Sequence, residues 1–162
     1  MDAHVKVTRR RRPRGSLSRA QIVEAALRMA DEQGIEGLSM PKLARQLNCG
    51  VMTIYGYISS KEELITAAAQ RGLADLHLPA PLPHSAEDIL IAWGRALRGT
   101  LLEHPSLPTI FLSQVVMGPG ILKGIEALLT ALAGAGLSAG SGIHAIYAVL
   151  VHTTGFVAWE LP

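Results

Sequence analysis

The feature that most constrains the fold is a series of helix-start signals, each followed by apolar residues at helical spacing. The first is Ser18 with Gln21 three residues later, a capping box that satisfies two backbone N–H groups at the start of a helix. Ser39, with Pro41 in the first turn, and Ser85 begin later helices in the same way. No segment alternates polar and apolar residues as a strand would. The sequence therefore predicts an all-α protein.

The helices expected from this periodicity can be bounded by their caps and breakers. Two overlapping capping boxes, Ser59 with Glu62 and Ser60 with Glu63, mark one start. The proline-rich run 78–83 cannot be helical, because each proline pushes the preceding residue toward extended geometry. The expected helices are 19 to Gly34, 40–47, Val51–Tyr57, 61 to about Leu76, 86–103, about Ser106 to Met117, Ile121–Ala135 and Ser141–Glu160.

Charge is distributed unevenly along the 162 residues. The net charge is +5 over residues 1–72 and −3 over residues 73–162, although the whole chain carries only +2. We predict a disordered basic arm over 1–17, an N-terminal helical domain over 18–77 and a second helical domain over 85–162. The arm's basic cluster is Arg9, Arg10, Arg11 and Arg12. Such a basic half indicates a polyanionic partner, although a solvated tail is the alternative.

Composition excludes several classes of protein. With 49% hydrophobic residues the chain can bury a core, and Cys49 as the single cysteine excludes a disulfide scaffold or a cysteine zinc site. No signal-peptide pattern begins the chain, and the apolar run 143–159 is shorter than a membrane span and contains His and Thr, which favours a buried helix. We therefore expect a cytoplasmic protein with no membrane partner.

Catalytic and metal-binding patterns are missing from the sequence. There is no phosphate-binding glycine loop, nucleophile elbow or catalytic carboxylate pair. His144 and His152 are eight residues apart, further than a metal-binding pair on one helix requires. The sequence thus predicts no enzyme, no metal and no cofactor.

Residues 39–58 have the build of a helix-turn-helix. Two short helices are separated by Asn48-Cys49-Gly50, and Ala44 is small where they would cross. With Ile54 as core anchor, the second helix can present its other side chains to a major groove, and its N-terminal amides can bind phosphate. Packing is the alternative role for the two tyrosines. The DNA-facing candidates are Gly50, Val51, Met52, Thr53, Tyr55 and Tyr57.

The stretch "IVEAALRMADEQGIEGLSMPKLARQLNCGVMTIYGYISSKEELITAA" resembles the DNA-binding domain of the tetracycline-repressor (TetR) family of bacterial transcription regulators. The resemblance implies three N-terminal helices that bind DNA, followed by a helical regulatory domain. It implies that Thr53 contacts bases, that Tyr55 and Tyr57 contact phosphates or bases, and that Lys61 contacts phosphate. Ser39 resembles a capping residue that can also touch phosphate.

The C-terminal half resembles, more loosely, the regulatory domain of the tetracycline-repressor branch, through "WGRALRGTLLEHPSLPTIFLSQ" and "AIYAVLVHTTGFVAWE". This implies a small-molecule effector pocket between helices. Family members usually continue past the position of Pro162 with a further helix of the dimer bundle. Core packing, or capping for His104, is the alternative role of the pocket candidates. They are Trp93, His104, Phe111, Gln114 and Met117.

These observations predict a ligand-responsive repressor. Two heads of a homodimer would read double-stranded DNA at a palindromic operator, and the effector would favour a conformation that no longer fits the groove spacing. The helix 141–160 is apolar nearly all round, which predicts that a partner chain covers its second side. The alternative is a non-specific DNA-binding module in which the basic arm provides most of the affinity.

Overall fold

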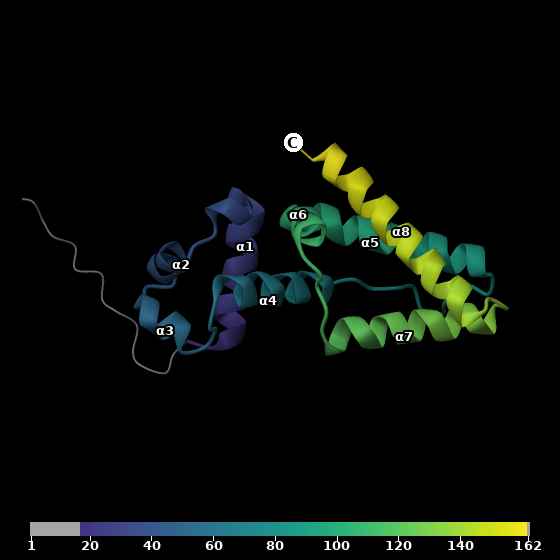
Figure 1. Ribbon diagram of the computed structural model, residues 1–162, viewed down its shortest axis with the longest axis horizontal. Helices are drawn as coiled ribbons and strands as arrows, with labels where there is room; N and C mark the ends of the chain where they lie inside the picture. Colours follow the sequence, from purple (N-terminus) through teal and green to yellow (C-terminus); the bar gives the residue numbers. More distant parts are fainter. Residues whose placement is uncertain (1–16, 162) are drawn as a thin grey trace, which may run out of the picture.

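The computed structural model describes residues 17–161, and every regular element in that range is a helix, which confirms the all-α prediction (Figure 1). Helices α1 to α4 form one end of the molecule, and α5 to α8 form the other. Their bounds are α1 (Arg19–Gly37), α2 (Met40–Gln46), α3 (Val51–Tyr55), α4 (Lys61–Leu73), α5 (Ala86–Glu103), α6 (Ser106–Ser113), α7 (Pro119–Gly134) and α8 (Ala139–Glu160).

The N-terminal end, which we call the head (residues 17–73), is built on α1 packed against α4. The predicted capping box is present, since the Ser18 hydroxyl accepts from the backbone N–H of Gln21 and the Gln21 side chain accepts from that of Ser18. Gly34 has φ +73°, a left-handed conformation that favours glycine and interrupts α1 where the sequence predicted its end. Small and aliphatic side chains from all four helices share one buried core.

The C-terminal half (residues 86–161) has its own core, to which α5 contributes Ile89, Trp93, Leu97 and Leu101. Helix α8 crosses α5 diagonally, and α7 runs below both in the view of Figure 1. Ala69 belongs to this second core, and Ile65 packs against both cores. Helix α4 therefore connects the head to the C-terminal half by packing as well as by sequence.

Several helix boundaries differ from the expected ones. Helix α4 ends at Leu73 and α6 at Ser113, earlier than predicted, whereas α7 begins at Pro119 and α8 at Ala139, two residues earlier than predicted. The last shift has a clear cause, because the Ser138 hydroxyl accepts from the backbone N–H of Ser141 and caps the helix there.

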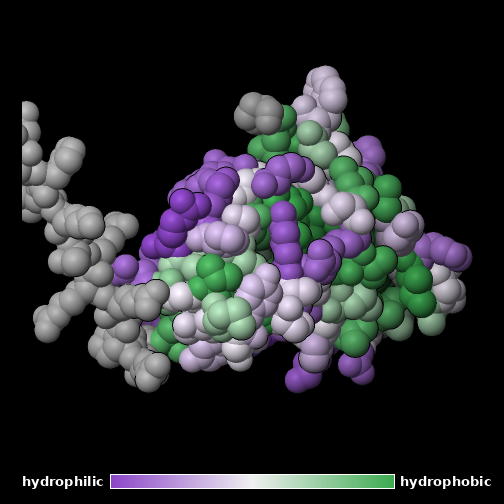
Figure 2. Space-filling model, turned by 60° about the vertical axis from the view of Figure 1, so that its left-hand side comes forward, coloured by the Kyte–Doolittle hydropathy of each residue, from purple (hydrophilic) through white to green (hydrophobic). Residues whose placement is uncertain are grey.

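Helix α8 is long and apolar enough to cross a membrane by length and composition alone, and its most apolar window is only 22% buried. In the single chain only Gly142, Ile146, Thr154 and Val157 of α8 are buried, so its second side is exposed. That a partner chain covers this side stays a prediction. Figure 2 shows hydrophobic surface, in green, gathered toward the right-hand side of the view. The large apolar side chains exposed on α8 are Ile143, Tyr147, Val151, Phe156 and Trp159.

Candidate nucleic-acid interface

The two short helices α2 and α3 pack against each other as the helix-turn-helix prediction requires. Ser39 caps α2, with its hydroxyl accepting from the backbone N–H of Lys42. Asn48 makes the sharp turn between the helices with φ +58°, a left-handed conformation that asparagine tolerates better than most residues. Gly50 then stands as the N-cap of α3 with extended backbone and no side chain to satisfy the first N–H groups.

Helix α3 is anchored by one side chain and exposes the others. Ile54 is fully buried in the core of the head, and Val51 packs partly against that core. Met52 is 79% exposed and Tyr55 44% exposed, and Thr53 is exposed beside them. Because α3 ends at Tyr55, two residues earlier than expected, its outward surface is a single short patch. That patch offers a thioether, a hydroxyl and a phenol to a ligand.

Lys61 is the first residue of α4, which begins six residues after the end of α3. Of the two predicted capping boxes, only Ser60 serves as N-cap, its hydroxyl accepting from the backbone N–H of Glu63. The Glu63 carboxylate instead accepts from the backbone N–H and the hydroxyl of Ser59, at 2.8 Å and 2.7 Å, and from Arg19 at 3.1 Å. The Ser59 hydrogen bonds, followed by the one from Arg19, lower the pKa of Glu63 from 4.5 to about 2.

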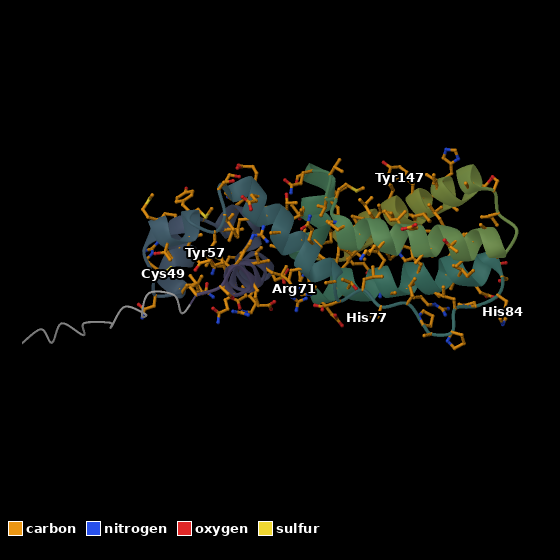
Figure 3. The ribbon with its side chains drawn as sticks, turned by 90° about the horizontal axis from the view of Figure 1, so that it is seen from below. Cys49, Tyr57, Arg71, His77, His84 and Tyr147 are labelled. Atoms are coloured by element: carbon orange, nitrogen blue, oxygen red, sulfur yellow. The ribbon has the colours of Figure 1, made fainter. Side chains whose placement is uncertain are left out.

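Tyr57 has a structural contact that the sequence did not reveal. Its hydroxyl donates a hydrogen bond to the backbone carbonyl of Leu17 at 2.8 Å. This bond connects the residue just before α1 with the turn after α3. Figure 3 shows Tyr57 and Cys49 in the head, at the same end of the molecule. With its hydroxyl engaged, Tyr57 is a weaker candidate for a phosphate contact than Tyr55. The arginines of the predicted basic arm, Arg9, Arg10, Arg11 and Arg12, lie outside the residues that the structure describes.

Sequence reasoning also passed over the exposed face of α2. Lys42 and Arg45 are exposed there, and their side chains donate to the carbonyls of Gly37 and Pro41. Basic residues on the solvent face of the first helix of the motif were the available signal. Both lie on a helix that packs against α3, which makes them further candidates for a phosphate contact.

The five predicted effector residues do not converge on one cavity. Trp93 is buried in the C-terminal core, Phe111 packs against that core and Met117 is exposed. His104 contacts the Asp31 carboxylate at 2.9 Å, and the Gln114 side-chain amide donates to the Thr66 hydroxyl at 3.2 Å. Two of the five thus lie where the C-terminal half meets the head, and their role in effector binding stays a prediction.

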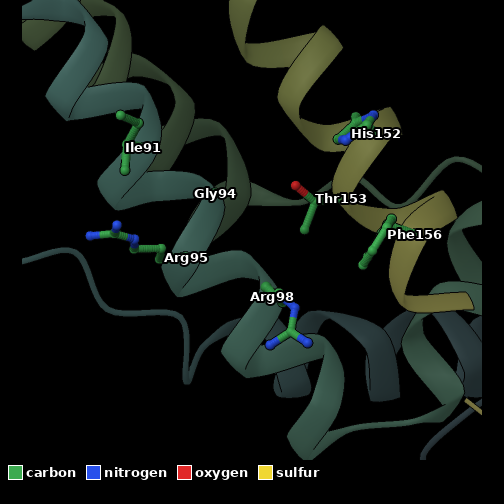
Figure 4. A pocket seen from close by; sticks show the side chains of 7 residues that line it. All are labelled: Ile91, Gly94, Arg95, Arg98, His152, Thr153 and Phe156. Carbon is green, nitrogen blue, oxygen red and sulfur yellow. The ribbon is translucent and has the colours of Figure 1, made fainter. Parts of the chain in front are cut away.

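A shallow groove of about 310 Å³ lies between α5 and α8 instead (Figure 4). Arg95 and Arg98 line one wall, and His152, Thr153 and Phe156 line the other. Arg98 also forms an ion pair with Glu160 at 2.8 Å. Deeper in the same half, the hydroxyl of Thr154 is buried without a hydrogen-bond partner among the described residues. Over residues 17–161 no cluster of His, Cys, Asp or Glu could hold a metal ion.

Two family profiles match the chain along nearly its whole described length. The profile described as "Bacterial regulatory proteins, tetR family" matches residues 22–68, and "Tetracyclin repressor-like, C-terminal domain" matches residues 78–161. The chain belongs to the TetR family of bacterial transcriptional regulators. The resemblance inferred from the sequence is thereby confirmed for both halves.

Relatives and solved structures agree with this assignment. The HTH-type transcriptional repressor DrrR1 of Streptomyces coeruleorubidus is 32% identical over 152 residues, which are 93% of this chain and 56% of that protein. The TetR family protein ActR of Streptomyces coelicolor, solved with actinorhodin, has a TM-score of 0.82 and 25% identity, covering 90% of this chain and 68% of ActR. BioQ, solved with its natural double-stranded DNA operator, has a TM-score of 0.72 and 29% identity, covering 89% of this chain and 87% of BioQ.

The chain spans 56–61% of the length of the curated relatives that it matches first. What these longer TetR-family proteins bind and how they assemble is therefore carried to this chain only as a proposal.

Proposed function

We propose that this TetR-family chain is a sequence-specific DNA-binding transcription regulator, a ligand-responsive repressor that releases its operator when an effector binds. The observation that carries the proposal is α3, a five-residue helix held by buried Ile54 that turns Met52, Thr53 and Tyr55 outward. A helix this short is not stable alone, so its docked position is set by the head and its exposed face is available for recognition. BioQ, a relative of similar fold, was solved on its operator.

The chemistry of this face suits a major groove. A threonine methyl or the Met52 side chain can contact a thymine methyl, and the Tyr55 hydroxyl can donate to phosphate or to a base acceptor. The N–H groups at the start of α3, after Gly50, and the Lys61 ammonium are suited to the phosphates on either side. The face thus combines base-reading groups with phosphate-binding groups at its edges.

The test is selection of a duplex from a random pool by the full chain, followed by titration at one salt concentration. Wild type should bind the selected duplex at least about 1000-fold more tightly than random duplex. Thr53→Ala and Tyr55→Ala should each lose roughly 1–3 kcal/mol on the selected duplex. Thr130→Ala, an exposed threonine on α7, is the matched control and should bind as wild type does. Equal affinity for selected and random duplex would instead favour the non-specific, arm-driven module.

We infer that the regulator acts as a homodimer through the exposed face of α8. Trp159 is 82% exposed, and with Tyr147, Val151 and Phe156 it forms an apolar surface of the kind that partner chains cover. An isologous pairing would place two heads on the two halves of a palindromic operator. Sedimentation at micromolar concentration should show twice the monomer mass for wild type and a lighter species for Trp159→Glu. A wild type that stays a soluble monomer would contradict this assembly.

The effector is proposed to bind within the C-terminal half, where Thr154 provides a buried hydroxyl that lacks a partner among the described residues. An unsatisfied buried hydroxyl is unfavourable, so a ligand that hydrogen-bonds to it gains affinity at this position. The five residues predicted from the sequence remain candidates beside it. This function requires no enzymatic step, and a DNA-binding regulator works in the cytoplasm, where the bacterial chromosome lies.

A further inference from the structure

Helix α6 receives its N-terminal cap from the head. Its own N-cap position is Pro105, which has no side-chain hydrogen bond to offer, so the first N–H groups of α6 need another acceptor. The acceptor is Asp31 on α1. Its Oδ1 atom accepts hydrogen bonds from the backbone N–H of Ser106, at 3.1 Å, and from the Ser106 hydroxyl, at 2.6 Å. A residue in the DNA-binding half thus completes a helix of the regulatory half.

The same carboxylate holds the residue that ends α5. Its second oxygen lies 2.9 Å from Nδ1 of His104, and since an ionised carboxylate only accepts, Nδ1 carries the proton. The side chains of Asp31 and His104 are only 15% and 18% exposed, so water competes little for these bonds. Both oxygens of Asp31 are therefore engaged across the boundary between the two halves.

Further charges extend this contact into a network. Nε2 of His104 lies 3.6 Å from Asp75, just after α4, and Arg71 contacts both Asp75, at 2.7 Å, and Glu24 on α1, at 2.9 Å. Figure 3 shows Arg71 midway along the molecule, between Cys49 in the head and Tyr147 in the C-terminal half. The hydrogen bond from Arg71 is the largest cause that lowers the pKa of Asp75, so this carboxylate stays charged.

Packing leaves little free space at this end of α6. A Cβ built on Gly72 of α4 would lie 3.2 Å from a Leu107 methyl and 3.3 Å from the His104 ring, so α4 and α6 touch closely here. At the other end of α6, Gln114 donates to Thr66 and the Gln70 side chain donates to the carbonyl of Met117. Helix α6 is thus attached to α1 at its first turn and to α4 around its last.

We propose that Asp31 is the positioning residue that couples the two halves: it fixes the first turn of α6 to α1, so α6 cannot shift without moving the head or breaking this cap. The inference rests on the proposed function for its consequence, because a signal from an effector site would reach α3 through this contact. Binding linkage is reciprocal, so DNA held by α3 must in turn stabilise the first turn of α6.

The test is backbone hydrogen exchange of the full chain, free and saturated with the selected duplex. In wild type the duplex should slow exchange of residues 104–110 by a factor of about five or more, the lower end of typical coupling. In Asp31→Ala the duplex should still protect the head but leave 104–110 unchanged. Asp31→Asn keeps one oxygen for Ser106 and should restore part of the transmitted protection. Asp88→Ala is the matched control, since that carboxylate accepts from Ser85 within the C-terminal half alone.

Two results would overturn the coupling: wild type binds the duplex without slowing exchange at 104–110, or Asp31→Ala transmits protection as wild type does.

A chain that selects no duplex would refute the proposed function instead. In that case, hydrogen exchange of the DNA-free wild type and of DNA-free Asp31→Ala tests whether Asp31 caps α6. Exchange at 104–110 should be roughly tenfold faster in Asp31→Ala than in wild type, as expected for a lost helix cap. Equal exchange in the two free proteins would overturn the inference. Should Asp31→Ala not fold, Asp31→Asn serves in its place, because a neutral amide oxygen is a weaker acceptor than a carboxylate and exchange at 104–110 should still be faster than in wild type.

Discussion

Ile54 and Met52 lie two residues apart on α3, and the structure assigns them opposite roles. Ile54 is fully buried in the core of the head, whereas Met52 is 79% exposed. Ile54→Ala removes a buried side chain and should lower the free energy of unfolding by about 2–5 kcal/mol. With a urea m-value near 2 kcal/mol/M, a loss of about 3 kcal/mol lowers the unfolding midpoint by roughly 1–2 M. Because α3 has only five residues, it should also detach from the head more readily.

Met52→Ala provides the matched comparison on the same helix. Its stability should stay within about 0.5 kcal/mol of wild type, as for most exposed substitutions. Its affinity for the selected duplex should fall by about 1–3 kcal/mol if the side chain reads a base edge. Urea unfolding followed by circular dichroism and a gel-shift titration measure the two quantities. The reasoning is refuted if Ile54→Ala unfolds at the wild-type midpoint, or if Met52→Ala loses as much stability as Ile54→Ala.

Four further predictions follow from the site and the C-terminal half. Lys61→Ala should weaken binding about equally on all duplexes and reduce the slope of log affinity against log salt by about one, as measured by titration at several salt concentrations. Deletion of residues 1–14, which removes six basic side chains, should lower affinity and flatten that slope without changing the selected sequence; unchanged affinity at low salt would make the arm dispensable. The pKa of Glu63 is lowered from 4.5 to about 2 in the folded chain, so its contribution to stability is present above about pH 4.5 and is lost as the pH falls toward 2. Glu63→Gln should therefore show a smaller loss of thermal stability over that pH range than wild type. Thr154→Val, which removes the unpartnered buried hydroxyl, should leave the free chain as stable as wild type or raise its stability by about 1 kcal/mol, as read from thermal unfolding.

The sequence predicted the helices and the helix-turn-helix because their determinants are local. Ser18 and Gln21 cap each other within one turn, and the break at Gly34 depends on a single backbone angle. The burial of Ile54 and the exposure of Thr53 follow from helical periodicity alone. The early end of α3 at Tyr55 was missed, because nothing in the run through Tyr57 breaks a helix as strongly as proline does.

Contacts between residues far apart in sequence could not be predicted in this way. Tyr57 was assigned to DNA from its position in the motif, yet its hydroxyl donates to Leu17, 40 residues earlier. His104 was a candidate effector residue because it lies near a helix end where such a pocket would open, whereas its partner Asp31 is 73 residues away on α1. One sequence alone does not indicate that two such distant residues are in contact, because each of them by itself is typical of a solvent-exposed polar position.

The division of the chain into two cores explains why these few long-range polar contacts matter. Each half has its own buried cluster, and Ile35, Ile65 and Ala69 of the head pack in or against the cluster of the other half. Their relative placement depends on this apolar packing, to which both α1 and α4 contribute, and on the polar contacts at the two ends of α6. Apolar packing tolerates small sliding, whereas a carboxylate that accepts three hydrogen bonds, as Asp31 does, fixes distance and direction. The angle at which α3 is presented is therefore set by a small number of bonds that a modest shift of α6 can break.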